Sequence, residues 1–324
     1  MSEPAVSETA AAPGDCPLCG SSEQRPRFRA SDRLFRTTTR QFKIVECASC
    51  GVLYLSPRPA GAELAGYYPP GYWWSGGSEG GAARRLEGIY RRTVLGDHVA
   101  FVTSVLGGPP ARILDVGCGS GDLLAALRQR GYSCCGMDAS LAALAAAHRQ
   151  GIAAVLGDYH AAPLAAESFD AVSMFHFLEH VPDPAAALAF ARAVLRPSGR
   201  LIVQVPNAAS WQTAAMGARW SGFDVPRHLV NFRRADLERL VERSGFRIGR
   251  LKHFSLRDNP AALATSLAPG LEPVSRRSRR RESVSWRLAL DMAYFALVVA
   301  ALPLAAAEAL AGRGATIMLE ARKC

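Results

Sequence analysis

The chain has 324 residues, of which 49% are hydrophobic and 20% are charged, a globular composition that excludes a wholly disordered chain and a coiled coil. The net charge of +10 is unevenly spread, because Arg219 to Arg287 holds 16 Lys and Arg against 7 Asp and Glu. Such a concentrated positive field favours anionic partners, such as phosphate groups, nucleic acid or acidic lipid surfaces.

The N-terminus is small and polar, with no apolar run, so it does not have the pattern of a secretory signal. We therefore expect a cytoplasmic protein whose eight cysteines stay reduced rather than forming a disulfide framework. A disordered start is expected before the first cysteine.

Two CxxC pairs, each followed by glycine, predict a structural zinc site whose ligands are Cys16, Cys19, Cys47 and Cys50. An alternating segment, Arg40 to Glu46, leads into the second pair as a strand, and the whole resembles a zinc ribbon. Because four protein thiolates complete the tetrahedron, no coordination position is left for catalysis. Chance cysteine pairs or a redox CxxC are the alternatives.

A connector follows, with three tyrosines, Tyr67, Tyr68 and Tyr72, ahead of two tryptophans and a Gly/Ser-rich stretch. These aromatic residues either form a lid over a ligand or pack against the ribbon. Apolar residues at helical spacing predict a helix from Leu86 to Leu106, which Gly107 to Pro110 ends.

The middle of the chain begins with a short apolar strand, a glycine-rich turn and a helix from about Asp122 to Arg130. The strand carries Asp115, and Gly117, Gly119 and Gly121 follow, so that backbone can approach a ligand closely. No Lys-Ser/Thr follows the glycines, which excludes a Walker A phosphate loop and favours a nucleoside.

Further acids stand after the next two strands. Asp138 ends the strand that starts at Tyr132, where a βαβ unit places the carboxylate that accepts both ribose hydroxyls. Asp158, followed by Tyr159, stands where an acid would accept from an adenine amino group. Strands at 168–175 and 200–205 and a helix at 184–195 continue the alternation, which predicts a doubly wound, mostly parallel α/β sheet.

These residues resemble the class I S-adenosylmethionine-dependent methyltransferases, through LDVGCGSGDLL, GMDAS, GDYHAAPLAAESFDAV, FHFLEHVPDP and LRPSGRLIVQVPN in the family's order and spacing. The resemblance covers about Arg112 to Leu256 and implies S-adenosylmethionine as cofactor and a seven-stranded Rossmann-like sheet. A dinucleotide dehydrogenase is the alternative for this sheet. LEHVPDP and FDVPRHLVNFRRADLERLVERSGF are similar to the branch with ubiquinone-type O-methyltransferases and sugar methyltransferases, some of which also carry paired CxxC and a YYxxxY segment.

Three histidines, His176, His180 and His228, are candidates for the general base that a hydroxyl or carbon-acid acceptor requires. The alternative is that Glu179 and His180 cap a helix beginning near Pro182, and that His228 packs or orients the substrate.

RNA methylation is the rival activity, given the positive charge. It is disfavoured because Phe175 to His180 replaces the Asn/Asp-Pro-Pro-aromatic sequence usual in amino-directed base methyltransferases, and because aromatic residues do not interleave with the basic ones. A third reading is a non-catalytic zinc-ribbon binding module on a vestigial methyltransferase scaffold.

The C-terminal part contains an insert between a strand at 245–255 and a final strand at 315–323. A basic run, Arg276 to Arg281, precedes an uncharged run, Met292 to Ala307, that is too short for a membrane span. Since the final strand must rejoin the sheet, we expect a helical hairpin broken near Pro303. It would pack on the enzyme, form a homodimer contact or lie on the inner face of the cell membrane through residues 276–311.

The expected organisation is therefore an α/β methyltransferase of a small or carrier-linked metabolite, such as a nucleotide sugar or a lipid-linked intermediate. Its predicted parts are a disordered start and ribbon (1–56), a connector (57–110), the methyltransferase domain (111–257), the insert (258–312) and the final strand (313–324).

Overall fold

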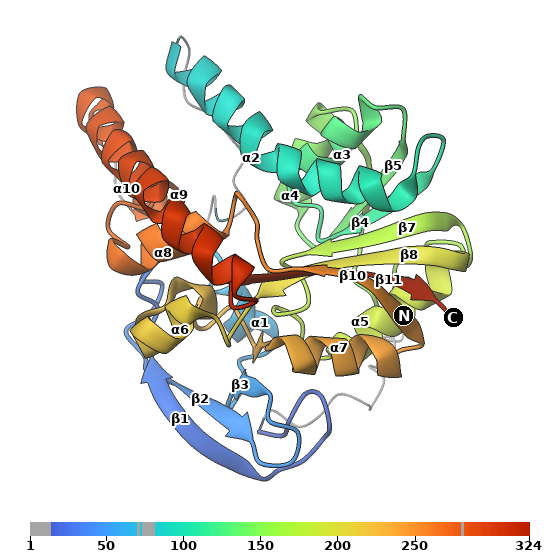
Figure 1. Ribbon diagram of the computed structural model, residues 1–324, viewed down its shortest axis with the longest axis horizontal. Helices are drawn as coiled ribbons and strands as arrows, with labels where there is room; N and C mark the ends of the chain where they lie inside the picture. Colours follow the sequence, from blue (N-terminus) through green and yellow to red (C-terminus); the bar gives the residue numbers. More distant parts are fainter. Residues whose placement is uncertain (1–13, 70–71, 73–81, 280–281) are drawn as a thin grey trace.

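Residues 14–69, 72, 82–279 and 282–324 are described by a computed structural model of the chain (Figure 1). The predicted disordered start, the two tryptophans of the connector and two arginines of the basic run, Arg280 and Arg281, lie outside the described residues.

A seven-stranded sheet forms the centre of the molecule, in the order β10-β11-β8-β7-β4-β5-β6. Its strands are β4 (Arg112–Val116), β5 (Ser133–Asp138), β6 (Ala153–Leu156), β7 (Phe169–Phe175), β8 (Leu195–Pro206), β10 (Phe246–Lys252) and β11 (Thr316–Lys323). Only β11 runs antiparallel to its neighbours among these strands. The predicted mostly parallel sheet, including its final strand, is confirmed.

Helices cover both faces of this sheet (Figure 1). One face carries α2 (Ala82–Leu106), α3 (Asp122–Arg128) and α4 (Leu141–Arg149), and the other carries α5 (Pro184–Val194) and α7 (Arg234–Arg243). Central strands such as β4 and β7 are apolar runs because both of their faces are buried.

Helix α5 is capped by Asp183, whose Oδ1 accepts a hydrogen bond from the backbone N–H of Ala186 at 2.9 Å. The alternative that Glu179 and His180 cap this helix is therefore wrong. Both residues precede the cap, and of the two His180 lines the cavity.

The N-terminal residues form a second, antiparallel sheet of β1 (Gln24–Ala30), β2 (Phe42–Cys47), β3 (Leu53–Leu55) and β9 (Val230–Asn231), followed by α1 (Gly61–Ala65). We call residues 14–56 the ribbon segment. Its sheet is completed by β9, which follows β8 of the seven-stranded sheet in the chain, with Leu53 opposite Asn231 and Tyr54 opposite Val230. The sheet of the ribbon segment is therefore continuous with a later part of the chain and is not closed on itself.

Two groups of helices complete the molecule near the cavity. After β8 come α6 (Trp211–Met216) and two short 3-10 turns, Gly217–Arg219 and Ser221–Phe223. Between β10 and β11 lies the predicted helical insert, which consists of α8 (Asn259–Leu267), α9 (Pro273–Arg279) and α10 (Val284–Leu310). In Figure 1 these three helices stand together at one side of the sheet, and α10 projects beyond it.

The predicted break near Pro303 is wrong, because α10 continues through that residue. Proline removes one helical hydrogen bond and crowds the preceding turn, at a cost of about 3 kcal/mol. The helix nevertheless buries one stripe on both sides of the proline, formed by Val298, Ala301, Ala305 and Glu308. Breaking the helix would expose this stripe, so packing outweighs the local preference.

Candidate active site

A cavity of about 470 Å³ opens where the carboxyl ends of β4 and β7 lie side by side. The connections leave these two strands in opposite directions, and such a switch point is where open α/β sheets bind ligands. The cavity is lined by the glycine loop after β4, by the segment after β7, by residues 220–228 and by helices α8 and α10 of the insert.

The three predicted glycines form a loop with left-handed backbone, with φ of 74° at Gly117, 53° at Gly119 and 80° at Gly121. A Cβ atom at Gly117 would lie 2.8 Å from the ring of Phe177, whereas one at Gly119 would meet no atom within 4 Å. Gly119 therefore faces open space at the cavity wall. A side chain there would occupy the room that a closely approaching nucleoside needs, so the loop fits S-adenosylmethionine.

Asp138, at the end of β5, ties this loop to the next helix. Its Oδ2 accepts from the backbone N–H of Gly119 at 3.0 Å and its Oδ1 from that of Ser140 at 2.8 Å. Burial raises the pKa of Asp138, although these N–H groups oppose the shift. Lone pairs remain on both oxygens for ligand hydroxyls, as the predicted ribose contact requires.

Asp115 lines the cavity beside the loop and is almost fully buried. Its Oδ1 accepts from the hydroxyl of Ser173 at 2.6 Å. Burial raises the pKa of Asp115 to about 7, and the charge of Asp138 adds to that shift although the Ser173 bond opposes it. Within the described residues, no cation pairs with this carboxyl.

The other two predicted cofactor residues stand apart from the cavity. Asp158 is exposed, and its Oδ1 accepts from the backbone N–H of His160 at 2.9 Å. Tyr159 is buried edge-on against Phe177. Neither residue lines the cavity, and neither does Asp138, so their contacts with the cofactor stay predictions.

His176 follows β7 in left-handed backbone with φ of 51°. Its Nδ1 lies 3.2 Å from Glu179 Oε1 and its Nε2 lies 3.3 Å from Asp258 Oδ1. Burial disfavours the charged ring, but these two carboxylates outweigh burial and raise the pKa of His176 to about 10. The raised pKa favours a charged ring at neutral pH, a state that disfavours it as the base, whereas the Gln204 amide nitrogen 2.7 Å from Nε2 favours a neutral ring.

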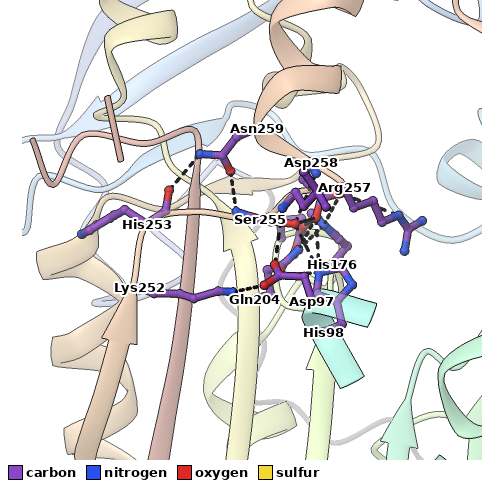
Figure 2. A network of polar contacts seen from close by, with 12 residues as sticks. Asp97, His98, His176, Gln204, Lys252, His253, Ser255, Arg257, Asp258 and Asn259 are labelled. Carbon is purple, nitrogen blue, oxygen red and sulfur yellow. Dashed lines mark hydrogen bonds and ion pairs between the residues drawn. The ribbon is translucent and has the colours of Figure 1, made fainter. Parts of the chain in front are cut away.

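A polar network surrounds His176, as Figure 2 shows. The Gln204 amide donates to Asp258 Oδ2 at 2.7 Å and accepts from His98 Nε2 at 2.8 Å, and the Ser255 hydroxyl donates to the same Asp258 oxygen at 2.6 Å. The network joins α2, β7, β8 and the start of the insert. Of its members, only His176 was singled out from the sequence.

His180 is held in a defined proton state. Its Nδ1 lies 3.1 Å from the carbonyl oxygen of Arg227 and 3.0 Å from Tyr68 Oη. Since a carbonyl only accepts, Nδ1 carries the hydrogen. Burial, reinforced by neighbouring His228, lowers the pKa of His180 to about 4. The ring is neutral at pH 7, and Nε2 makes no hydrogen bond within the described part of the chain.

His228 stands beside His180, with ring centroids 4.5 Å apart and nearly perpendicular planes. Its Nδ1 donates to the carbonyl of Gly222 at 2.8 Å. Both rings line the cavity. The structure therefore brings together two of the three predicted histidines, each with Nδ1–H anchored on a backbone carbonyl.

The tyrosines of the connector pack behind these histidines. The rings of Tyr68 and Tyr72 lie 4.9 Å apart, and Tyr72 Oη donates to Asp224 Oδ2 at 3.0 Å. Burial raises the pKa of both phenols, so they remain protonated. Tyr72 also lines the cavity, so the described part of the segment both packs against its surroundings and contributes to the pocket wall.

The four predicted metal ligands form one cluster, in which all sulfur atoms lie within 4.8 Å of one another. The Sγ atoms of Cys16 and Cys50 lie 3.5 Å apart, as do those of Cys19 and Cys47. Tetrahedral zinc with Zn–S bonds of about 2.3 Å requires sulfur separations of about 3.8 Å. The donor set and its spacing fit zinc.

Comparison with known proteins places this geometry in a family. A family model described as a methyltransferase domain matches residues 89–250, which is half of the chain. A ubiquinone biosynthesis O-methyltransferase of Hahella chejuensis is 34% identical over 174 residues, covering 47% of this chain and 73% of that protein. A protein of the same name from Pseudomonas aeruginosa is 33% identical over 132 residues, covering 38% of this chain and 57% of that protein.

Among solved structures, a methyltransferase of Thermotoga maritima that depends on S-adenosylmethionine is 18% identical, covers 74% of this chain and 97% of its own, and has a TM-score of 0.46. The family match spans the glycine loop, Asp138 and all three candidate histidines. The chain belongs to the methyltransferase domain family and is a class I S-adenosylmethionine-dependent methyltransferase.

Proposed function

We propose that the protein methylates a hydroxyl or carbon acid of a small or carrier-linked metabolite, and that His180, with His228 beside it, removes the acceptor's proton. The carrying observation is the placement of the His180 ring, whose Nδ1–H is bound by the Arg227 carbonyl while the ring lines the cavity that the glycine loop also lines. A positioned, unprotonated Nε2 is what general-base catalysis requires.

The cofactor would be held by Asp138 and by the backbone of residues 117–121. When bound, it supplies a methyl group activated on a positive sulfur. The protein's own contribution is to hold the acceptor in line and exclude water, which lowers barriers of this kind by about 7–11 kcal/mol. The Asp115 carboxyl, whose pKa burial raises to about 7, is only partly ionised at neutral pH and has no cationic partner among the described residues.

The acceptor side includes residues outside the matched family region. Arg257, Thr265 and Tyr294 line the cavity but lie outside the matched residues. The ubiquinone O-methyltransferases support an oxygen atom as methyl acceptor, while the wall made by the insert calls for a different fit. A nucleotide sugar or lipid-linked intermediate is the class we propose.

The test combines calorimetry with S-adenosylhomocysteine and incubation of the protein with labelled S-adenosylmethionine and fractionated cell extract. We expect micromolar or tighter binding and a labelled small molecule in the mass spectrum. Absence of binding would overturn the enzyme and favour the vestigial scaffold, and label in RNA would favour the rival substrate. Normal turnover by both His180→Ala and His228→Ala would exclude base catalysis by these residues.

We also propose that the cysteine cluster holds zinc with a structural role. Four thiolates complete the tetrahedron and leave no position for substrate. Metal analysis of the purified protein should find one zinc per chain, and Cys16→Ser combined with Cys47→Ser should lose it. Retention of zinc by that variant would contradict the assignment.

Helix α10 is the basis of a proposal about location. Within the described residues it is the one helix long and apolar enough to cross a membrane by length and composition. Eight of its large apolar side chains are exposed, namely Val284, Trp286, Leu288, Met292, Phe295, Val299, Leu304 and Leu310. Because β11 follows at Thr316 and pairs with β8, a single crossing is excluded.

We propose that α10 lies on the inner face of the cell membrane. The basic run contributes less than its sequence suggests, because Arg276 pairs with Glu282 and Asp291, and Arg277 pairs with Asp291 at 2.7 Å. The apolar face should therefore dominate, and flotation with neutral vesicles should approach that with anionic ones. No flotation ends the membrane proposal, and dimers in light scattering would then favour a homodimer contact.

A further inference from the structure

Arg227 is the largest fully buried side chain among the described residues, and all five of its N–H groups are used. Nε and Nη2 donate to the two oxygens of Asp224 at 2.9 and 2.6 Å. Nη1 and Nη2 donate to the two oxygens of Asp32 at 3.1 and 2.9 Å, and Nη1 also donates to the carbonyl of Tyr67 at 2.9 Å. We call Asp32, Asp224 and Arg227 the clasp.

The clasp joins parts that are distant in sequence. Asp32 lies in the ribbon segment, 195 positions before Arg227. Its carboxylate also accepts from the backbone N–H groups of Phe35 and Thr37 and from the Thr37 hydroxyl. Although burial opposes it, Arg227 holds the pKa of Asp32 below its ordinary value. The ribbon segment therefore presents a fixed, ionised carboxylate to the pocket side.

Burying an arginine costs several kcal/mol unless every donor is paired. The backbone of Arg227 lies next to the two histidines of the cavity. The Arg227 carbonyl fixes the Nδ1–H of His180, and the next residue along the chain is His228. A shift of this backbone would move both rings that face the acceptor.

A second connection runs through the backbone of the ribbon segment. The N–H of Leu55, in β3, donates to the carbonyl of Leu229 at 3.0 Å, directly after His228. On the other side, the N–H groups of Leu229 and Val230 both donate to the carbonyl of Glu179, at 2.7 and 3.2 Å. The backbone of Leu229 and Val230, directly after His228, is thus bonded to Glu179, directly before His180. On its other side it is bonded to β3 of the ribbon segment.

We infer that the ribbon segment positions the acceptor-side histidines, and that Asp32, acting through Arg227, is a positioning residue that fixes the orientation and proton placement of the His180 ring. The inference rests on the proposed function for its consequence, namely that the ribbon controls proton removal. It gives the N-terminal segment a role in chemistry that neither its four-cysteine cluster nor the matched family region assigns.

The experiment uses the full-length, zinc-loaded protein labelled with ¹⁵N in its seven histidine rings. In the wild-type protein, NMR should show His180 as the Nδ1–H tautomer. In Asp32→Asn, its two ring nitrogens should move toward averaged shifts. The matched control is Glu46→Gln, which breaks the 3.0 Å ion pair with Arg233 across the same interface away from the cavity.

If Asp32→Asn does not fold, Thr37→Val removes only one hydroxyl from the carboxylate, and a smaller change in the same direction is expected. Unchanged His180 signals in whichever variant folds, or an equal change in Glu46→Gln, would overturn the inference. Once an acceptor is in hand, Asp32→Asn should lower kcat by about 10- to 100-fold with little change in S-adenosylhomocysteine affinity. Failure of the wild type to bind S-adenosylhomocysteine would instead overturn the proposed function.

Discussion

The two sides of the cavity are built differently. The cofactor side comes from one continuous stretch, from Asp115 through the glycine loop to Asp138, with the Ser173 hydroxyl on Asp115 as a contact from further along the chain. The acceptor side is assembled from the ribbon segment, the connector, the segment after β7, the loop after β8 and the insert. Local turn chemistry specifies the first side, and only the folded molecule specifies the second.

Their carboxylates differ in the same way. On the cofactor side, burial raises the pKa of Asp115 and Asp138, which have no cationic partner within the described residues. On the acceptor side, burial is outweighed by Arg227 at Asp224 and by His176 at Asp258, so their pKa values fall. Carboxyls with free bonding capacity remain available to a ligand, whereas paired carboxylates fix the protein around it.

Removal of the metal should have the largest effect, and it should affect the acceptor side without the cofactor side. Chelation of the proposed zinc should unfold the ribbon segment, because about 10–16 kcal/mol of apparent binding free energy supports such sites. The backbone bonds to β9 and the clasp would be lost, so acceptor turnover should vanish. Affinity for S-adenosylhomocysteine should change by only about twofold, because among the described residues the glycine loop and Asp138 make their hydrogen bonds outside the ribbon segment.

Calorimetry before and after chelation, with far-ultraviolet circular dichroism to follow folding, makes the measurement. Readdition of zinc should restore turnover. A loss of S-adenosylhomocysteine binding in step with the metal would show that the sides are not independent and would break the comparison.

The next effect distinguishes two glycines of the same loop. Gly117→Ala introduces a Cβ 2.8 Å from Phe177 at a positive φ and should lower the free energy of unfolding by about 2–4 kcal/mol. Gly119→Ala has the backbone cost without the clash, about 1–2 kcal/mol, but should weaken S-adenosylhomocysteine binding more. Urea unfolding and calorimetry on both variants provide the test, and equal effects on binding would contradict an open cradle at Gly119.

The sequence predicted the cofactor side because its signals are contiguous. Asp115, the glycines and Asp138 follow a strand-turn-helix order that has one common use. Asp32 and Asp258 had no such signal, because each acquires its role from partners that the fold brings close. His176 was singled out for its position after a strand, and the carboxylates that keep it charged include Asp258 from the insert.

The third prediction tests this charged histidine through pH. The pKa of His176 in the folded protein is about 10, above its unfolded value of about 6.5. Its contribution to stability is therefore complete below about pH 6.5 and is lost as the pH rises toward 10. Between pH 6.5 and 10, the wild type should lose about 1–3 kcal/mol of unfolding free energy that His176→Gln does not lose.

Asp258 sets the opposite limit. Its depressed pKa contributes stability that is present above about pH 4 and is lost as the pH falls. Urea unfolding across pH should thus show a plateau between about pH 4 and 6.5 in the wild type. Parallel curves for the wild type and His176→Gln above pH 6.5 would mean that the ring is neutral, which would return His176 to the candidates for the base.

The smallest effect concerns Pro303, where the local preference of proline against a helix interior is overridden by tertiary packing. Pro303→Ala restores a helical N–H in α10 and relieves crowding of the preceding turn. The same change increases the conformational entropy of the unfolded chain, which offsets about 0.4–1 kcal/mol of that stabilisation. We expect the free energy of unfolding to rise by about 1–2 kcal/mol, with unchanged S-adenosylhomocysteine affinity. Ala306→Pro, about one turn further along the same helix, serves as the matched control and should lower the free energy of unfolding by about 3 kcal/mol. If Pro303 instead ended a helix, as the sequence predicts, Pro303→Ala would not raise the free energy of unfolding. The acceptor side would then depend less on the buried stripe of α10 than the structure indicates.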